Sequence, residues 1–210
     1  MNDAFFKLPE DKQSLILYIG TKEFAAKPFV EVSTDAITQN CGISKGLLFH
    51  YFENKANFYL YCLEKSIQQL TVPTAVHTEG NFYDLLFESL DDKIRLCNTY
   101  PNETHLVNMA SRETHASVKE GKDLILGKYM LEAKQSSAAI YARVLSKLNL
   151  KEPENPKVAE GLILYTSAII SKYLTIYQNS PDGFFENIEL IKLELKEYLD
   201  LMLEGIVAKQ

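Results

Sequence analysis

The chain has 210 residues, of which 46% are apolar and 24% are charged, and its formal net charge is −6 at pH 7. These values are typical of a globular protein and exclude a largely disordered chain. The negative charge also excludes a general nucleic-acid coat protein. The first 70 residues carry seven Lys and eight Asp or Glu, against 15 Lys or Arg and 20 acids in residues 71–210. Any anion-binding surface must therefore be local, and we expect it in the first third.

The cysteines indicate the compartment. Cys41, Cys62 and Cys97 are odd in number and form no C-x-x-C pair, and we see no signal peptide. Such a pattern predicts a reducing cytoplasm. The longest uncharged apolar stretch near the C-terminal half, residues 161–171, is shorter than the roughly 20 residues that span a bilayer. We therefore expect a cytoplasmic protein without a membrane segment.

The first third predicts four helices. Ser33 or Thr34 begins the second of them as its N-cap, and Gly42 ends it as a left-handed residue. Ser44 and Asn54 are the N-caps of the third and fourth. These helices are predicted at residues 9–27, 33–41, 45–52 and 55–70.

A linker is predicted at residues 71–81, which contain Pro73 and Gly80. We place a domain boundary there, between residues 1–70 and residues 71–210. Helical patterns also fill the second part, at residues 82–100, 101–116, 119–150, 157–178 and 184–208. With about nine helices and no convincing strand, the fold class is all-α.

The last two helices are apolar over a wide arc. One row of the last helix consists of Ile188, Ile191, Leu195, Leu199, Met202 and Ile206, and an adjoining row of Leu190, Leu193, Leu201 and Leu203. The preceding helix has few charges and several small residues. This predicts a homodimer interface of four packed helices; the alternative is a helix buried centrally in its own monomer. The candidate interface residues are Ile169, Tyr173, Ile191, Leu195, Leu199 and Met202.

Two lysines occupy unusual positions. Lys45 and Lys55 each stand in the first turn of a predicted helix, where the helix dipole disfavours a cation by roughly 0.3–1 kcal/mol. A lysine is well placed there only beside an anion such as a DNA phosphate. The helix at 33–41, the turn at Gly42 and the helix from Lys45 together make a helix-turn-helix unit at about residues 33–52, whose second helix enters the major groove.

The segment STDAITQNCGISKGLLFHYFENKANFYLYCLEK, residues 33–65, resembles the DNA-binding head of the TetR family, the tetracycline-repressor-like bacterial transcription regulators. The helix-turn-helix spacing, the G-I-S-K-G run, the aromatic run and the following lysine carry the resemblance. It implies contacts to DNA through specific residues of the head. These are Thr34, Ser44, Lys45, Gly46, Leu47, Phe49, His50, Tyr51 and Lys55. The head departs from the family at Phe49, where Tyr is common, at Cys41, where Ala is usual, and at Pro28, where Gly is usual.

The second domain is expected to bind a small molecule. Aromatic residues and one polar helix face are candidate pocket residues, because such sites combine apolar walls with a few polar groups. Simple core packing is the alternative for the aromatic residues, and exposed helix surface for the polar ones. The candidates are Phe87, His105, Met109, Arg112, Tyr129, Tyr141 and Tyr165. In the head, Phe52, Phe58 and Leu63 are expected in the core.

The sequence thus predicts a homodimeric, ligand-responsive regulator, more typically a repressor, that binds a pseudo-palindromic DNA operator and is released by an unidentified small-molecule effector. We find no metalloprotease, nucleophile-elbow, phosphate-loop or di-metal motif, so we expect no enzyme, no metal and no cofactor. The alternative is a helical protein- or lipid-binding module with a degenerate DNA-binding head.

Overall fold

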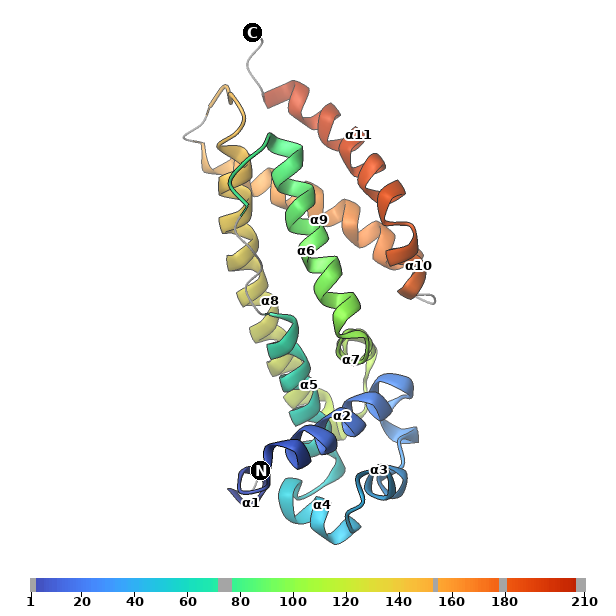
Figure 1. Ribbon diagram of the computed structural model, residues 1–210. Helices are drawn as coiled ribbons and strands as arrows, with labels where there is room; N and C mark the ends of the chain where they lie inside the picture. The colour runs from blue at the N-terminus through green and yellow to red at the C-terminus, as the bar shows by residue number, and fades with distance from the viewer. Residues whose placement is uncertain (1–2, 72–76, 153–154, 178–180, 207–210) are drawn as a thin grey trace. The chain divides into compact units, whose positions relative to one another are not determined.

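A computed structural model describes residues 3–71, 77–152, 155–177 and 181–206 of the chain (Figure 1). These residues form eleven α-helices and one 3₁₀ turn, and no strand occurs among them. The predicted all-α class is confirmed. The elements are α1 (Asp3–Phe6), α2 (Glu10–Ala26), the 3₁₀ turn η1 (Phe29–Glu31), α3 (Thr34–Cys41), α4 (Lys45–Phe52), α5 (Lys55–Leu70), α6 (Phe82–Thr99), α7 (Pro101–Arg112), α8 (Ala116–Leu145), α9 (Pro156–Ile176), α10 (Pro181–Glu186) and α11 (Ile188–Ile206).

Most predicted helix boundaries agree with the structure, and the differences have local causes. The helix predicted from residue 101 to 116 ends at Arg112, because Glu113 has extended backbone angles and its carboxylate accepts from the next two N–H groups. The helix predicted at 184–208 is two helices. They separate at Asn187, whose side chain donates to the Gly183 carbonyl at 2.8 Å.

The chain folds into two compact units. One contains Met1–Pro73 and Leu96–Leu131, and the other contains Thr74–Arg95 and Glu132–Gln210. Residues 96–131 therefore pack with the N-terminal helices, although they follow the predicted linker. The functional division at residue 70 stays a prediction, and part of the linker, residues 72–76, lies outside the described residues.

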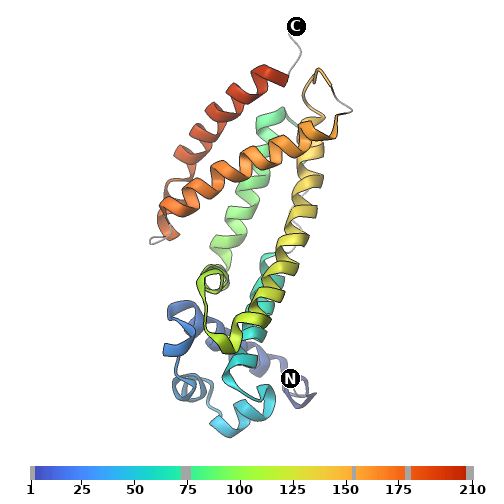
Figure 2. The same cartoon turned by 180° about the vertical axis from the view of Figure 1, so that it is seen from behind.

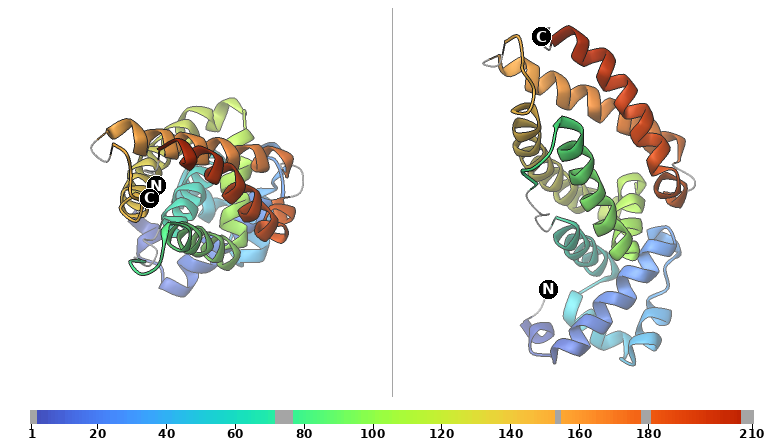
Figure 3. Two further views of the ribbon diagram at one scale, coloured as in Figure 1. Left: turned by 90° about the horizontal axis from the view of Figure 1, so that it is seen from above. Right: turned by 45° about the horizontal axis from the view of Figure 1, so that its top comes forward.

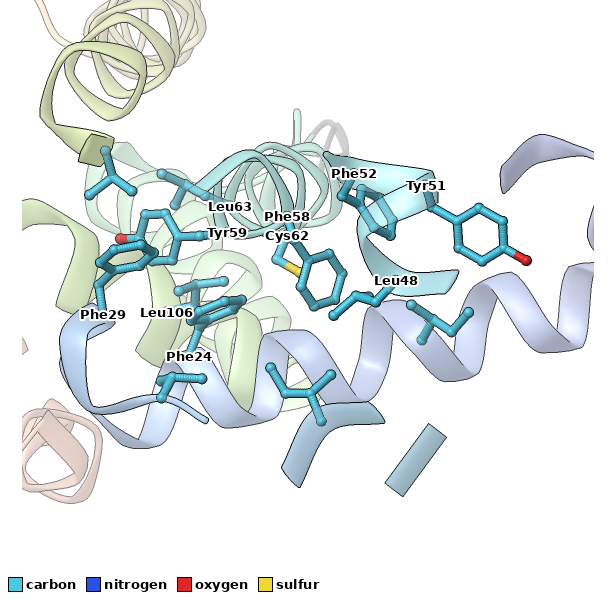
Figure 4. Close-up of a cluster of buried hydrophobic side chains, with 14 of the residues drawn as sticks. Phe24, Phe29, Leu48, Tyr51, Phe52, Phe58, Tyr59, Cys62, Leu63 and Leu106 are labelled. Atoms are coloured by element: carbon cyan, nitrogen blue, oxygen red, sulfur yellow. The ribbon is translucent and has the colours of Figure 1, made fainter. Parts of the chain in front are cut away.

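The first unit has an aromatic core between α2, α5 and α7 (Figure 4). Phe52, Phe58 and Leu63 are fully buried there, as predicted. Phe24 packs edge-to-face on Phe58 with ring centroids 5.8 Å apart. Gly20 lies directly under the Phe58 ring, where an added Cβ would come closer than van der Waals contact permits. This close approach lets α2 and α5 fix the base on which the helix-turn-helix rests.

The second unit packs α9 and α11 as antiparallel neighbours, which lie side by side in Figures 2 and 3. Leu162, Leu195 and Leu199 are buried in its apolar core. Polar contacts tie α6 to α11: the Tyr83 hydroxyl donates to Asp200, which also accepts from Lys196 at 2.7 Å. The Lys196 contact, followed by the Tyr83 contact, lowers the pKa of the Asp200 carboxyl.

Candidate nucleic-acid interface

A tight turn joins α3 to α4. Gly42 has φ 62° and ψ 38°, the left-handed conformation in which a side chain is strained. Its N–H donates to the Gln39 carbonyl at 3.1 Å, and the Ile43 N–H donates to the Thr38 carbonyl at 3.0 Å. These bonds satisfy carbonyl groups at the end of α3. Gly42 thus ends α3 as predicted and turns the chain into the next helix.

Side-chain caps set where the helices of the head begin. Ser44 accepts from the Leu47 N–H at 3.1 Å, and Asn54 accepts from the Asn57 N–H at 2.9 Å. Caps of this type are worth roughly 0.5–2 kcal/mol each. They make Lys45 and Lys55 the first residues of α4 and α5, as the sequence predicts.

The entry of α4 is open to solvent. Ser44, Lys45, Gly46 and His50 are exposed. A Cβ built on Gly46 would meet only the Ser44 hydroxyl oxygen, at 3.9 Å. Packing within the protein therefore does not require a glycine at this position, whereas a close external partner would.

The other predicted contact residues are less accessible. Thr34, Leu47, Phe49 and Lys55 are half-buried. Tyr51 is only 4% exposed, and its ring packs edge-to-face on Phe5 at a centroid distance of 5.8 Å. Tyr51 therefore joins α4 to α1, a packing role that the aromatic run alone does not indicate.

Both lysines have partners within the head. Lys45 pairs with Asp35 of α3, its Nζ lying 2.9 Å from Oδ1 and 3.0 Å from Oδ2. The Lys55 Nζ lies 4.6 Å from the centre of the Phe29 ring and donates to the Val30 carbonyl at 3.4 Å. Burial lowers the pKa of Lys55, and the Glu113 carboxylate opposes that effect. The sequence does not predict these partners, although the acidic residue in the first turn of α3 is a visible signal for the first.

Glu113 connects the end of α7 to the head. Its Oε2 accepts from the Phe29 N–H at 2.9 Å, and its Oε1 accepts from the N–H groups of Thr114 and His115 at 2.9 and 2.8 Å. Burial acts to raise the pKa of this carboxyl, but the three N–H donors hold it below its ordinary value. Lys122 donates to the Glu113 carbonyl at 3.0 Å. The end of α7, the turn before α3 and, through Lys122, α8 thus meet at one residue, Glu113.

The structure distributes the predicted pocket residues over both units. His105, Met109, Arg112 and Tyr129 belong to the first unit, and Phe87, Tyr141 and Tyr165 to the second. Burial raises the pKa of the Tyr129 and Tyr141 hydroxyls, and Tyr141 is nearly buried in the core of the second unit. Their role in ligand binding stays a prediction. Among the described residues, no group of three His, Cys, Asp or Glu side chains is arranged to hold a metal ion.

Most predicted interface residues pack inside the protomer. Ile169, Tyr173, Ile191, Leu195 and Leu199 are buried in the core of the second unit, and Met202 is half-buried against it. The adjoining row of the last helix is exposed at Leu190, Leu193 and Leu201, whereas its fourth member, Leu203, is buried. Five large apolar side chains of α9 and α11 are between 54% and 69% exposed: Leu164, Ile176, Leu190, Leu193 and Leu201.

Comparison with known proteins decides what this head is. Residues 16–62 match the family model described as bacterial regulatory proteins, tetR family. These residues are thus similar to the DNA-binding head of tetR-family regulators. The resemblance stated from the sequence is confirmed over these residues, and the match supports a DNA-binding transcription regulator. No curated protein matches the chain.

Solved structures match nearly the whole chain. A TetR family transcriptional regulator from Chloroflexus aurantiacus J-10-fl is 21% identical with a TM-score of 0.53, and 99% of each chain is covered. NalD of Pseudomonas aeruginosa is 18% identical with a TM-score of 0.57, covering 96% of this chain and 99% of its own. At these identities the likeness concerns the fold alone. Among the described residues, no helix is long and apolar enough to cross a membrane.

Proposed function

We propose that the protein is a homodimeric repressor that binds a pseudo-palindromic operator and is released by a small molecule in the C-terminal part of the chain. The observation that carries the proposal is the entry of α4, where Lys45 and Gly46 stand exposed beside a capped helix N-terminus. Such an end presents N–H groups and a positive dipole to a phosphate, and the following residues face base edges. In the proposed division of labour, residues 1–70 bind DNA and residues 71–210 bind the effector and the second subunit.

The second subunit is proposed to dock on the exposed faces of α9 and α11. The small residues Gly161, Ser167, Ala168 and Ser171 of α9 are all exposed, beside Leu164. Small residues let two helices approach closely, and the apolar side chains around them supply the buried area. A two-fold axis there would use one patch twice, as homodimers usually do.

The dimer is tested by introducing charge at Ala168. Ala168→Arg keeps the protomer core intact, because the position is exposed, but places a large cation in the proposed contact. Ala142→Arg, at an exposed position of α8 in the same unit, is the matched control. Light scattering should show a dimer of the 23.9 kDa chain for the wild type and the control, and a monomer for Ala168→Arg. A monomeric wild type, or a dimeric Ala168→Arg, would refute this interface.

Release by an effector needs a connection between the ligand-binding part and the head. The Glu113 contacts support such a connection, because they join the C-terminal end of α7 and the residues just before α8 to the turn before α3. A ligand acts only through its different affinity for two arrangements of the protein. NalD, whose fold this chain shares, is described as the secondary repressor of the MexAB-OprM multidrug efflux pump, which supports repression as the mode.

DNA binding is tested by selecting duplexes from a random library with the wild type and Gly46→Gln in parallel. The glutamine has room within the protein and favours a helix by up to about 1 kcal/mol relative to glycine, so the variant should fold at least as well. It should nevertheless lose the enriched palindrome, because its side chain occupies the DNA-facing entry. Gly127→Gln, also in open space but on α8, is the control and should select the same palindrome as the wild type. No enrichment by the wild type would refute the proposed function.

A further inference from the structure

An acidic side chain shares the DNA-facing entry with Lys45. Asp35 stands in the first turn of α3, and both of its carboxylate oxygens lie within 3.0 Å of the Lys45 ammonium. The two side chains are 73% and 47% exposed, so neither is fixed by burial. The pair bridges the first turns of the two helices of the helix-turn-helix.

Each partner has a different reason to be there. The dipole of α3 favours an anion in its first turn, so Asp35 suits its own helix. The dipole of α4 disfavours a cation in its first turn, so Lys45 suits its own helix only if an anion lies near it. In the free protein that anion is Asp35, and in a complex it would be a phosphate. The phosphate must therefore displace Asp35 or share the lysine with it.

Lys55 provides the contrast within the same head. Its ammonium lies over the neutral Phe29 ring and donates to a neutral carbonyl. Neither of these contacts is with a carboxylate, although the Glu113 carboxylate also acts on the charge of Lys55. Lys45 instead enters any complex with its charge already compensated, and Asp35 is left facing the phosphate backbone if the lysine turns away.

From this geometry we infer that Asp35 is a positioning residue that holds Lys45 back from DNA of arbitrary sequence and so lowers non-specific affinity. The inference rests on the proposed function, since it requires α4 to approach the duplex. Specificity is the ratio of operator affinity to non-specific affinity. An acid that weakens binding to the DNA backbone raises this ratio, because base contacts restore the lost affinity at the operator but not at other sequences.

The effect appears in both affinity and salt dependence. Removal of the Asp35 carboxylate frees Lys45 from its ion pair and removes the repulsion between Asp35 and the DNA phosphates. Each effect is modest at a solvated surface, so the affinity for a duplex of random sequence should rise roughly twofold to tenfold. A lysine that no longer leaves an unpaired acid behind contributes one more released counterion. The slope of log K against log salt should then steepen by about 0.9.

The experiment uses the full chain and a fluorescein-labelled duplex of random sequence, titrated at salt concentrations between about 50 and 200 mM. The variants are Asp35→Asn, Lys45→Ala and the double variant, with Glu31→Gln, another exposed acid of the head, as the matched change of charge. Circular dichroism melting checks folding, and Asp35→Ser is a second neutral variant, since serine suits the first turn of a helix.

The expected result is tighter binding and a steeper slope for Asp35→Asn, with most of the gain lost when Lys45 is also alanine. Glu31→Gln should gain less and keep the wild-type slope. The inference is overturned if the wild type binds the duplex but Asp35→Asn has the same affinity and slope as Glu31→Gln. It is also overturned if Asp35→Asn raises the affinity as much in the Lys45→Ala background as in the wild type. Absence of binding by the wild type and by every variant would instead refute the proposed function, and this inference with it.

Discussion

Replacement of Glu113 by glutamine should release the turn before α3 from the end of α7. The carboxylate accepts three N–H groups, two on Oε1 and one, from Phe29, on Oε2. Glutamine offers a single oxygen, so its NH₂ group must face at least one of these donors. A hydrogen bond to a charged group contributes about 1.5–3 kcal/mol, and because Glu113 is half-buried the lower end, about 1.5 kcal/mol, applies.

The assay is amide hydrogen exchange of Phe29, whose N–H is the donor at risk. A loss of about 1.4 kcal/mol corresponds to a tenfold loss of protection. At neutral pH the Phe29 amide should therefore exchange about tenfold faster in Glu113→Gln than in the wild type. Glu120→Gln, an exposed acid of α8, is the control and should leave Phe29 protected. Equal protection of Phe29 in Glu113→Gln and the wild type would refute the reasoning.

The pH dependence gives the same prediction a second test. The pKa of Glu113 is lowered in the folded protein, so its contribution to stability is complete above the unfolded pKa, about 4.3, and is lost as the pH falls through the folded value. Protection of Phe29 in the wild type should fall toward that of Glu113→Gln at acid pH, while the glutamine variant has no such titration. A difference between the two proteins that persists unchanged below pH 4 would show that the charge is not its cause.

Three further outcomes are expected. Gly20→Ala should lower the free energy of unfolding by about 1–2 kcal/mol, because overpacking against the buried Phe58 ring outweighs the gain in helix propensity; Gly127→Ala, in open space, should raise it by up to about 1 kcal/mol in the same urea titration. Lys55→Ala should weaken binding to every duplex similarly and flatten the salt slope by about 0.9, whereas an unchanged slope would remove this lysine from the phosphate contacts. In the native protein a thiol reagent should modify Cys97 rapidly and the two other cysteines slowly, because burial raises their thiol pKa and blocks access; three fast thiols without denaturant would contradict the packing of the head.

Local chemistry made the head predictable from its sequence. The caps Ser44 and Asn54 and the left-handed Gly42 act within four residues along the chain, so the bounds of α4 and α5 follow directly from them. The pairing of Asp35 with Lys45 joins residues ten apart and depends on how the turn aims two helices. The spacing of the two residues along the sequence does not by itself predict the relative direction of α3 and α4.

Tertiary packing decides which apolar side chains of the last helix are available to a second subunit. The periodicity of the last helix reveals two apolar rows, but it does not show which row the protomer's own core takes. In the structure Ile191, Leu195 and Leu199 are in the core and Leu190 and Leu193 are exposed. The interface residues predicted on the last helix therefore lie on its mostly buried row, whereas the exposed Leu190, Leu193 and Leu201 support the proposal of a dimer.

The charges of the head connect its fold to its mode of binding. Residues 1–70 contain seven lysines and no arginine. Four of the lysines have contacts within the head: Lys12 with the Cys41 carbonyl, Lys45 with Asp35, Lys55 with the Phe29 ring, and Lys65 with the Gln68 amide. Only Lys45 is paired with an acid among these four contacts, and the other three partners are neutral, so the small number of basic residues is what limits attraction to the phosphate backbone. Under the proposed function, binding then depends also on a close fit at Gly46 and on base contacts from α4, and such a regulator would spend little time on DNA outside its operator.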